Sequence, residues 1–152
     1  WELGEIMANE DEEIRRMLVE LRLLEGSART LESRLAVVDS ALSEILIANS
    51  TLEGIKNKPK GTEALVPVGA GSFIRVELAD SEKIVMGVGA GVSLERSVND
   101  SIESLKNRQD DLEKLRTSLQ QQLSQIASRI EDERRTLNDI VKKRGGETVE
   151  VV

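Results

Sequence analysis

Two glycine-rich stretches carry the residues that come closest to a recognisable chemistry. Both read Val-Gly-Ala-Gly, at 68–71 and again at 88–91. Glycine-rich loops bind phosphate in many nucleotide-binding proteins, because backbone NH groups can approach the anion closely. Neither stretch has the GxGxxG spacing or the lysine and hydroxyl residue of a GxxxxGK[ST] loop, and no βαβ pattern surrounds them. The sequence therefore disfavours a nucleotide-binding site.

Other groups for catalysis or metal binding are scarce. The chain has no histidine and no cysteine, so it lacks the commonest general base, the commonest metal ligand and any thiol. Its carboxylates fall at positions expected for the solvent-facing sides of helices. We expect no catalytic residue, no metal site and no cofactor, and thus a protein that is not an enzyme. The lack of cysteine also favours a reducing, cytoplasmic location.

The composition favours long helices over a compact globule. The 152 residues include 28 acidic and 21 basic side chains, one Trp, one Phe and no Tyr. A globular core of this size usually contains several aromatic residues. The net charge of −7 disfavours nucleic acid as a partner, because phosphate repels acidic surfaces. No apolar run approaches the roughly 20 residues of a membrane-spanning helix, so no membrane contact is expected.

The first long element is predicted as a helix at residues 9–56. Its apolar residues recur at alternating steps of three and four, which places them on one seam of a helix that packs on a partner helix. Only Asn49 on this seam is polar, and a seam asparagine more often sets the register than binds a ligand. The seam consists of Ile14, Met17, Leu21, Leu24, Ala28, Leu31, Leu35, Val38, Leu42, Ile45, Asn49 and Leu52.

A second helix of the same kind is predicted at residues 97–144. Ser97 can cap its start, and Gly145 can take the left-handed position after its end. Residues 145–152 show no helical pattern and are predicted to be disordered. Arg116 and Glu133 on its seam either fix the register or extend to water. The seam consists of Val98, Ile102, Leu105, Gln109, Leu112, Arg116, Leu119, Leu123, Ile126, Ile130, Glu133, Leu137 and Ile140.

The segment between the helices, residues 64–95, alternates apolar and polar side chains with a period of two. This period predicts half-buried strands that share one apolar face, called here the even face. Tight glycine turns separate the strands in pairs, so each Val-Gly-Ala-Gly copy closes one β-hairpin. The strands are predicted at 65–69, 72–79, 82–88 and 91–95. The even face consists of Val66, Val68, Ile74, Val76, Leu78, Ile84, Met86, Val88, Val92 and Leu94.

The fold class follows from these elements. A long helix with one apolar seam is not stable unpaired in water. We therefore expect a mainly α protein, a long antiparallel two-helix coiled coil with two β-hairpins inserted at the turn. Two slim helices are not expected to cover the even face. The hairpins are then either a self-contained cap or an assembly module that joins hairpins of other chains. Four short strands are only marginally stable alone, which favours assembly.

The order helix, VPVGAGSFIRVEL, short link, VMGVGAGVSLERS, helix resembles the alpha-type subunit of prefoldin, in its archaeal form, over about residues 10–145. Its specific feature is the doubled hairpin, since beta-type subunits have one. The resemblance implies a hexamer with prefoldin beta subunits, two alpha plus four beta, in which the hairpins join an oligomeric β-barrel. It also implies an ATP-independent chaperone that binds unfolded polypeptides at coiled-coil tips and delivers them to a group II chaperonin.

Apolar residues near the chain termini are the predicted client-binding surface. Val19 and Leu23 lie off the seam, four residues apart, and so neighbour each other on the side that faces away from the partner helix. Ile6 and Met7 extend this apolar surface. Alternatively, they are the scattered aliphatics common on any surface. The predicted client-binding residues are Met17, Leu18, Val19, Leu23, Leu137, Ile140 and Val141.

A structural coiled-coil scaffold without client-holding activity is the alternative function. Such a protein would space or crosslink partners but would not prevent an unrelated unfolded protein from aggregating. Client binding therefore discriminates the two hypotheses.

Overall fold

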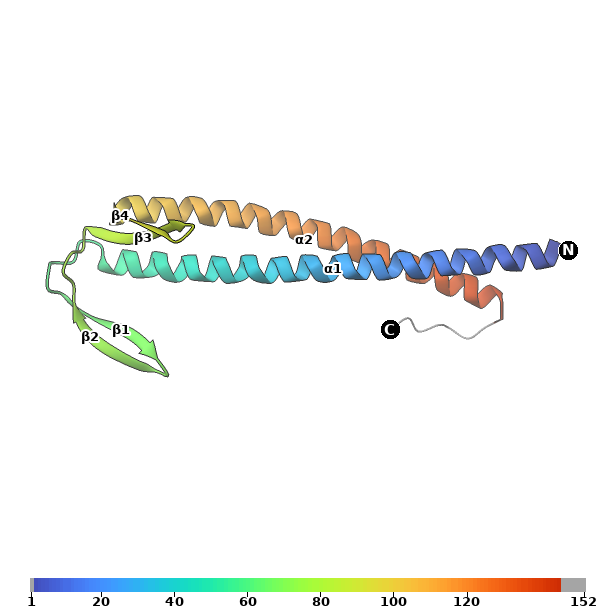
Figure 1. Ribbon diagram of the computed structural model, residues 1–152, viewed down its shortest axis with the longest axis horizontal. Coiled ribbons are helices and arrows are strands. Elements are labelled where there is room, and N and C mark those ends of the chain that lie inside the picture. Colours follow the sequence, from blue (N-terminus) through green and yellow to red (C-terminus); the bar gives the residue numbers. More distant parts are fainter. Residues whose placement is uncertain (1, 146–152) are drawn as a thin grey trace. The chain divides into compact units, whose positions relative to one another are not determined.

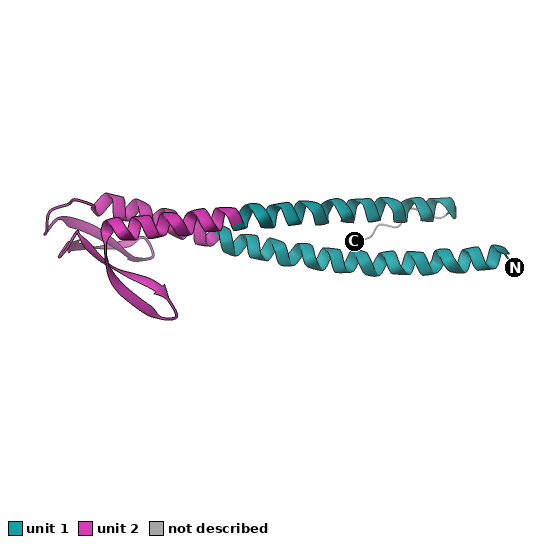
Figure 2. Cartoon of the chain, turned by 90° about the horizontal axis from the view of Figure 1, so that it is seen from above, with its two compact units in different colours: residues 1–39, 115–152 teal, residues 40–114 magenta. Residues whose placement is uncertain are grey.

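The computed structural model describes residues 2–145, and the predicted disordered tail lies outside them from Gly146 onward. The chain divides into two compact units, residues 1–39 with 115–152 (unit 1) and residues 40–114 (unit 2), shown in Figure 2. In chain order the elements are α1 (Glu2–Ile55), β1 (Glu63–Gly69), β2 (Ser72–Glu77), β3 (Lys83–Gly89), β4 (Val92–Ser97) and α2 (Val98–Lys143), labelled in Figure 1.

The predicted seams hold α1 and α2 together within each unit. Every seam position named above is buried or half-buried. In unit 1, Met17 and Leu21 of α1 pack against Leu137 of α2. In unit 2, Ile45 of α1 packs with Leu105 of α2. The two helices are therefore antiparallel in both units, and the predicted fold of two long helices with two inserted hairpins is confirmed.

Ion pairs between the helices of unit 1 share one arrangement, with the acid on α1 and the arginine on α2. Each is at least partly exposed to solvent and contributes at most about 1 kcal/mol, but together they favour the antiparallel pairing of these faces. They are Arg116–Asp39 at 2.6 Å, Arg129–Glu20 at 2.7 Å and Arg134–Glu25 at 2.8 Å. Arg116 thus contacts an acid of α1 rather than only extending to water.

Local signals explain most helix ends. The Asp100 backbone NH donates to Ser97 Oγ at 3.0 Å, which satisfies one of the free NH groups at the start of α2. Gly145 has a φ of 69°, the left-handed conformation predicted for it. Helix α1, however, begins at Glu2, ahead of the predicted start at residue 9. Acidic residues fill its first turn, where the helix dipole stabilises negative charge.

The two hairpins have the same turn. Each is closed by two residues, Ala70-Gly71 or Ala90-Gly91, and φ is positive at both, 49° and 73° in the first turn and 51° and 74° in the second. Two positive φ values give a type I′ turn, whose twist matches that of the strands. The predicted tight glycine turns are confirmed. Alanine in a left-handed conformation was not foreseen, and it strains both turns equally.

The surroundings of the two hairpins differ. β3–β4 lies along the ends of α1 and α2, whereas β1–β2 points away from the helix pair (Figure 1). Met86 of β3 is 7% exposed and belongs to a cluster with Ile45, Leu52, Val98 and Leu105. The expectation that the helices cannot cover the even face is therefore wrong for β3, because the ends of both helices reach the long methionine side chain.

Candidate interaction surfaces

The first turns of α1 expose large apolar side chains. Leu3 is 75% exposed, Ile6 56% and Met7 52%. Burying such side chains in a partner is favourable by about 25 cal/mol per Å² of apolar surface. Ile6 and Met7 were noted in the sequence, whereas Leu3 was missed because it precedes the predicted helix start.

The predicted client-binding residues fall into three groups. Val19 and Leu23 are exposed, as their positions off the seam predicted. Leu18, Ile140 and Val141 are half-buried. Met17 and Leu137 are buried in the core of unit 1, because they are the seam residues that hold the helices together. The structure thus leaves Val19 and Leu23 as the fully accessible members of the predicted set.

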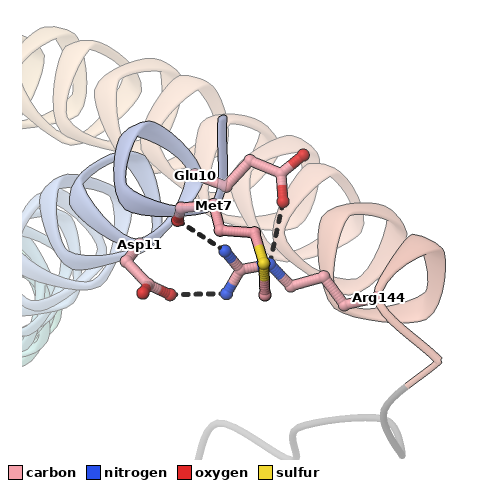
Figure 3. Close-up of polar contacts among 4 residues, drawn as sticks. All are labelled: Met7, Glu10, Asp11 and Arg144. Atoms are coloured by element: carbon pink, nitrogen blue, oxygen red, sulfur yellow. Dashed lines mark hydrogen bonds and ion pairs between the residues drawn. The ribbon is translucent and has the colours of Figure 1, made fainter. Parts of the chain in front are cut away.

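Arg144 joins the end of α2 to the early turns of α1 (Figure 3). Its Nε donates to Glu10 Oε2 at 2.8 Å, its Nη2 to the Met7 carbonyl oxygen at 2.8 Å, and its Nη1 to Asp11 Oδ1. Hydrogen bonds to Asp11 and Glu10 raise the pKa of the Arg144 guanidinium above its ordinary value, and the bond to Asp11 has the larger effect. This clamp was not predicted, although the acidic run at residues 10–13 and the basic residues at 142–144 are its sequence signal. It ties the α1 backbone at Met7 to the end of α2.

Glu133 on α2 and Asn49 on α1 have one buried side-chain oxygen each without a hydrogen-bond partner. These oxygens are Oε2 of Glu133 and Oδ1 of Asn49. Because Oδ1 of Asn49 has no hydrogen-bond partner, no hydrogen bond of this atom supports a register-setting role for Asn49. The buried oxygen of Glu133 is unfavourable for the stability of unit 1, because a buried polar atom without a partner costs free energy.

The predicted assembly residues of the even face are mostly accessible. Val76, Leu78 and Ile84 are half-buried and Met86 is buried. The others remain between 36% and 58% exposed: Val66, Val68, Ile74, Val88, Val92 and Leu94. Within one chain, therefore, most of this apolar face has no cover.

The opposite, odd-numbered face of β1–β2 is also apolar. Leu65 is 62% exposed and Phe73, the one phenylalanine of the chain, is 58% exposed. Pro67 pairs with Phe73 across the strands. This surface was not predicted, because the alternation of apolar and polar residues indicated one apolar face, made of even-numbered residues, and Leu65 and Phe73 lie on the other face.

Helix α1 is more apolar than the sequence reading allowed. By length and composition it is long and apolar enough to cross a membrane, with a mean hydropathy of 1.4 over an 18-residue window, so the expectation that no apolar run is long enough needs correction. Its seam residues Ile45 and Leu52 are buried in the coiled-coil core, so packing against α2 explains why this part of α1 is apolar.

Unit 1 also has a hollow on its surface, with a volume of about 480 Å³. The exposed side chains of Val37 and Leu115 border it.

Comparisons with known proteins agree with this architecture. The family model described as prefoldin subunit matches residues 24–143. The chain is similar to prefoldin subunit alpha of Methanopyrus kandleri, with 35% identity over 112 residues that cover 74% of this chain and 71% of the relative. It is also similar to prefoldin subunit alpha of Archaeoglobus fulgidus, with 34% identity over 127 residues, 81% of this chain and 92% of the relative.

A solved structure has the same fold. It is the cryo-EM structure of filamentous PFD from Methanocaldococcus jannaschii, which superposes with a TM-score of 0.62 over 74% of this chain and 93% of the other. The sequence identity is 22%, so this likeness concerns the fold alone.

Proposed function

The chain belongs to the prefoldin family, and on this basis we propose that it is the alpha-type subunit of an ATP-independent chaperone that holds unfolded polypeptides. The observation that carries the proposal is the apolar surface exposed on α1 in unit 1, at Leu3, Ile6, Met7, Val19 and Leu23. A holding chaperone needs apolar side chains that are accessible before the client arrives, because burial of apolar surface is non-directional and suits any unfolded chain.

Two features make this surface suitable for varied clients. Aliphatic side chains and a methionine adapt to many partner shapes. The Arg144 clamp joins the end of α2 to the early turns of α1, and it leaves the apolar side chains of these turns exposed. Client binding at these residues requires no catalytic group and no nucleotide.

Assembly is assigned to the hairpins. Exposed even-face residues such as Val66, Ile74 and Leu94 need a cover, and hairpins of further subunits can supply it by closing a β-barrel that removes unpaired strand edges. We assign the partners as prefoldin beta subunits, two alpha plus four beta. The complex would pass its clients to a group II chaperonin in the cytoplasm.

Aggregation of a denatured enzyme tests the proposal against the scaffold alternative. The complex is reconstituted with beta-type subunits, and light scattering is followed when the denatured enzyme is diluted into it. The variant Val19→Ser with Leu23→Ser should protect less, and adding Leu3→Ser, Ile6→Ser and Met7→Ser should weaken protection further. The matched control is Leu46→Ser with Ile47→Ser, which removes two aliphatics of α1 in unit 2 that are equally exposed.

The loss should be partial, since four of the six proposed coiled coils belong to beta-type subunits. A complex that assembles normally but never suppresses aggregation would support the scaffold. Equal loss in the control variant would show that the position of the apolar residues does not matter.

A further inference from the structure

The side of α1 that faces away from α2 carries arginines around the exposed Val19 and Leu23. Residues midway between the seam positions of a coiled-coil helix point away from the partner helix. Val19 and Leu23 lie on this side, and every arginine that shares it between residues 12 and 30 is exposed. These residues, all in unit 1, are called here the outward patch: Arg15, Arg16, Val19, Arg22, Leu23 and Arg29.

Three of the arginines form a regular row. Arg15, Arg22 and Arg29 follow each other at steps of seven residues, which keeps them on one line along a coiled-coil helix. At 1.5 Å per residue the step is about 10 Å. Val19 is four residues after Arg15 and three before Arg22, so its side chain neighbours both. The patch therefore combines a line of guanidinium groups with two aliphatic side chains.

The arginines of the patch are not used within the chain. Among residues 2–145, none of the four has an ion-pair or hydrogen-bond partner. Arg129 and Arg134 of α2, in the same unit, instead pair with Glu20 and Glu25 of α1. Between residues 12 and 30, the one acid on the side of the patch is Glu12. Guanidinium groups bind carboxylates through paired hydrogen bonds, so this surface suits an acidic ligand.

Gly26 lies on the same side of α1, three residues after Leu23. A glycine inside a helix is less stable than an alanine, and packing within the described residues does not require one here. A Cβ at Gly26 would meet nothing within 4 Å, and its φ is not positive. The missing side chain leaves a flat place beside Leu23, where an extended main chain can approach the helix closely.

The composition of the patch favours a peptide over other anions. The aromatic residues of the chain are Trp1 and Phe73, so the patch offers no ring on which a nucleic-acid base could stack. A helix that lies on a membrane needs a broad apolar face. Here the apolar seam of α1 is buried, at Met17 and Leu21 for example, and the outward side has two aliphatic residues.

We infer that the outward patch selects the clients of the proposed holding function, and that it prefers unfolded segments in which acidic residues recur with aliphatic residues between them. The inference rests on the proposed function. An unfolded chain in the polyproline II conformation places every third side chain on one side, at intervals of about 9 Å. Acids three residues apart therefore match the row of Arg15, Arg22 and Arg29. The aliphatic side chains between them cover Val19 and Leu23.

Binding of labelled peptides tests this preference. The probes are fluorescein-labelled peptides of repeated Glu-Val-Ser triplets and matched peptides with glutamine or lysine in place of glutamate. Fluorescence anisotropy is measured with the full chain, alone and reconstituted with beta-type subunits. The glutamate peptide should bind several-fold more tightly than the glutamine peptide at low ionic strength, and the lysine peptide most weakly. Added salt should reduce the preference, because it screens exposed charges. Equal binding of the glutamate and glutamine peptides overturns the inference.

Variants of the row show whether these arginines cause the preference. Changing Arg15, Arg22 and Arg29 together to glutamine should bring the ratio of the two affinities close to one. Changing the same three to lysine should retain part of the preference, since the charge remains but the paired hydrogen bonds do not. Circular dichroism checks that each variant keeps its helices.

A matched control removes the same number of exposed positive charges elsewhere, through Arg34→Gln, Lys58→Gln and Lys60→Gln. This variant should keep the preference for the glutamate peptide. Equal loss in the control would show that net charge, and not the patch, attracts acidic peptides, and would overturn the inference. Tighter binding of single-stranded RNA or anionic lipid vesicles than of the glutamate peptide would also overturn it.

The two proposals fail in different ways. A complex that protects a denatured enzyme from aggregation but binds the glutamate and glutamine peptides equally keeps the proposed function and loses the outward patch as a selective surface. A complex that neither protects the enzyme nor binds any of the peptides loses both.

Discussion

Two hairpins with the same turn meet different surroundings in this protein. Both have the sequence Val-Gly-Ala-Gly and the same pair of positive φ angles. β3–β4 is anchored on its own helices through the buried Met86, whereas β1 and β2 contain no buried residue. The comparison shows that local sequence determines the hairpin, while side-chain size and chain connection determine what the hairpin packs against.

Side chains on the even faces explain which hairpin is anchored. β3 has Ile84 and Met86 where β1 has Ala64 and Val66. The larger pair reaches the cluster formed by the helix ends. β4 also continues into α2 without a linker, at Ser97, so β3–β4 starts beside the helix that it packs against. β1–β2 lacks both features and is free to bind other chains.

The largest expected effect is on assembly. Ile74→Asp with Val76→Asp places charge on the even face of β1–β2, where burial of an unpaired charge is strongly unfavourable. The chain alone should keep its helical circular dichroism signal, but the complex with beta-type subunits should not form in sedimentation experiments. Normal assembly of this variant would show that β1–β2 is only a local cap.

A smaller effect is expected on the stability of the isolated chain. Met86→Ala should lower the free energy of unfolding by about 2–5 kcal/mol, as large-to-small changes in a core do. Val66→Ala, at the equivalent and exposed position of β1, should cost less than about 1 kcal/mol. Urea denaturation of both variants gives the values, and similar losses in the two would contradict the difference between the hairpins.

Substitutions in the two hairpin turns should change the free energy of unfolding equally, and by less than Met86→Ala does. Ala70→Gly and Ala90→Gly each remove a side chain from a left-handed conformation, which relieves about 1 kcal/mol of strain against a cost of similar size in chain entropy. Each change should therefore shift the unfolding free energy by less than about 1 kcal/mol. Thermal denaturation of the two variants should agree, and a marked difference would mean that surroundings affect the turns as well.

No effect is expected from ATP. The glycines of both copies belong to hairpin turns rather than to a loop before a helix, so they lack the arrangement that binds phosphate. Client protection by the complex should be the same with and without ATP, and calorimetry should detect no saturable binding. Saturable ATP binding abolished by Gly71→Val would overturn this assignment.

Patterns that depend on local sequence were predicted well. The seams of α1 and α2, the cap at Ser97 and the left-handed Gly145 each follow from spacing or from one residue type. The exposure of Val19 and Leu23 followed from their position on the helix. The start of α1 at Glu2 was not predicted, because residues ahead of the expected start at residue 9 also favour helix, with acidic side chains in the first turn.

Features that depend on tertiary contacts could not be predicted from the spacing of apolar residues and the secondary-structure propensities. Burial of Met86 requires knowing that two helix ends reach β3. The Arg144 clamp depends on which residues of α1 face the end of α2. The odd face of β1–β2 was missed for a different reason: Leu65 and Phe73 make that hairpin apolar on both sides, so a single apolar face does not describe it.

Hydrogen exchange in the free and assembled chain tests the difference between the hairpins most directly. The account predicts that β3–β4 amides are already protected in the free chain, because Met86 anchors the hairpin on the helices. Amides of β1–β2 should exchange faster in the free chain and become protected once beta-type subunits are added. Equal protection of both hairpins in the free chain, or no gain of protection in β1–β2 on assembly, would contradict it.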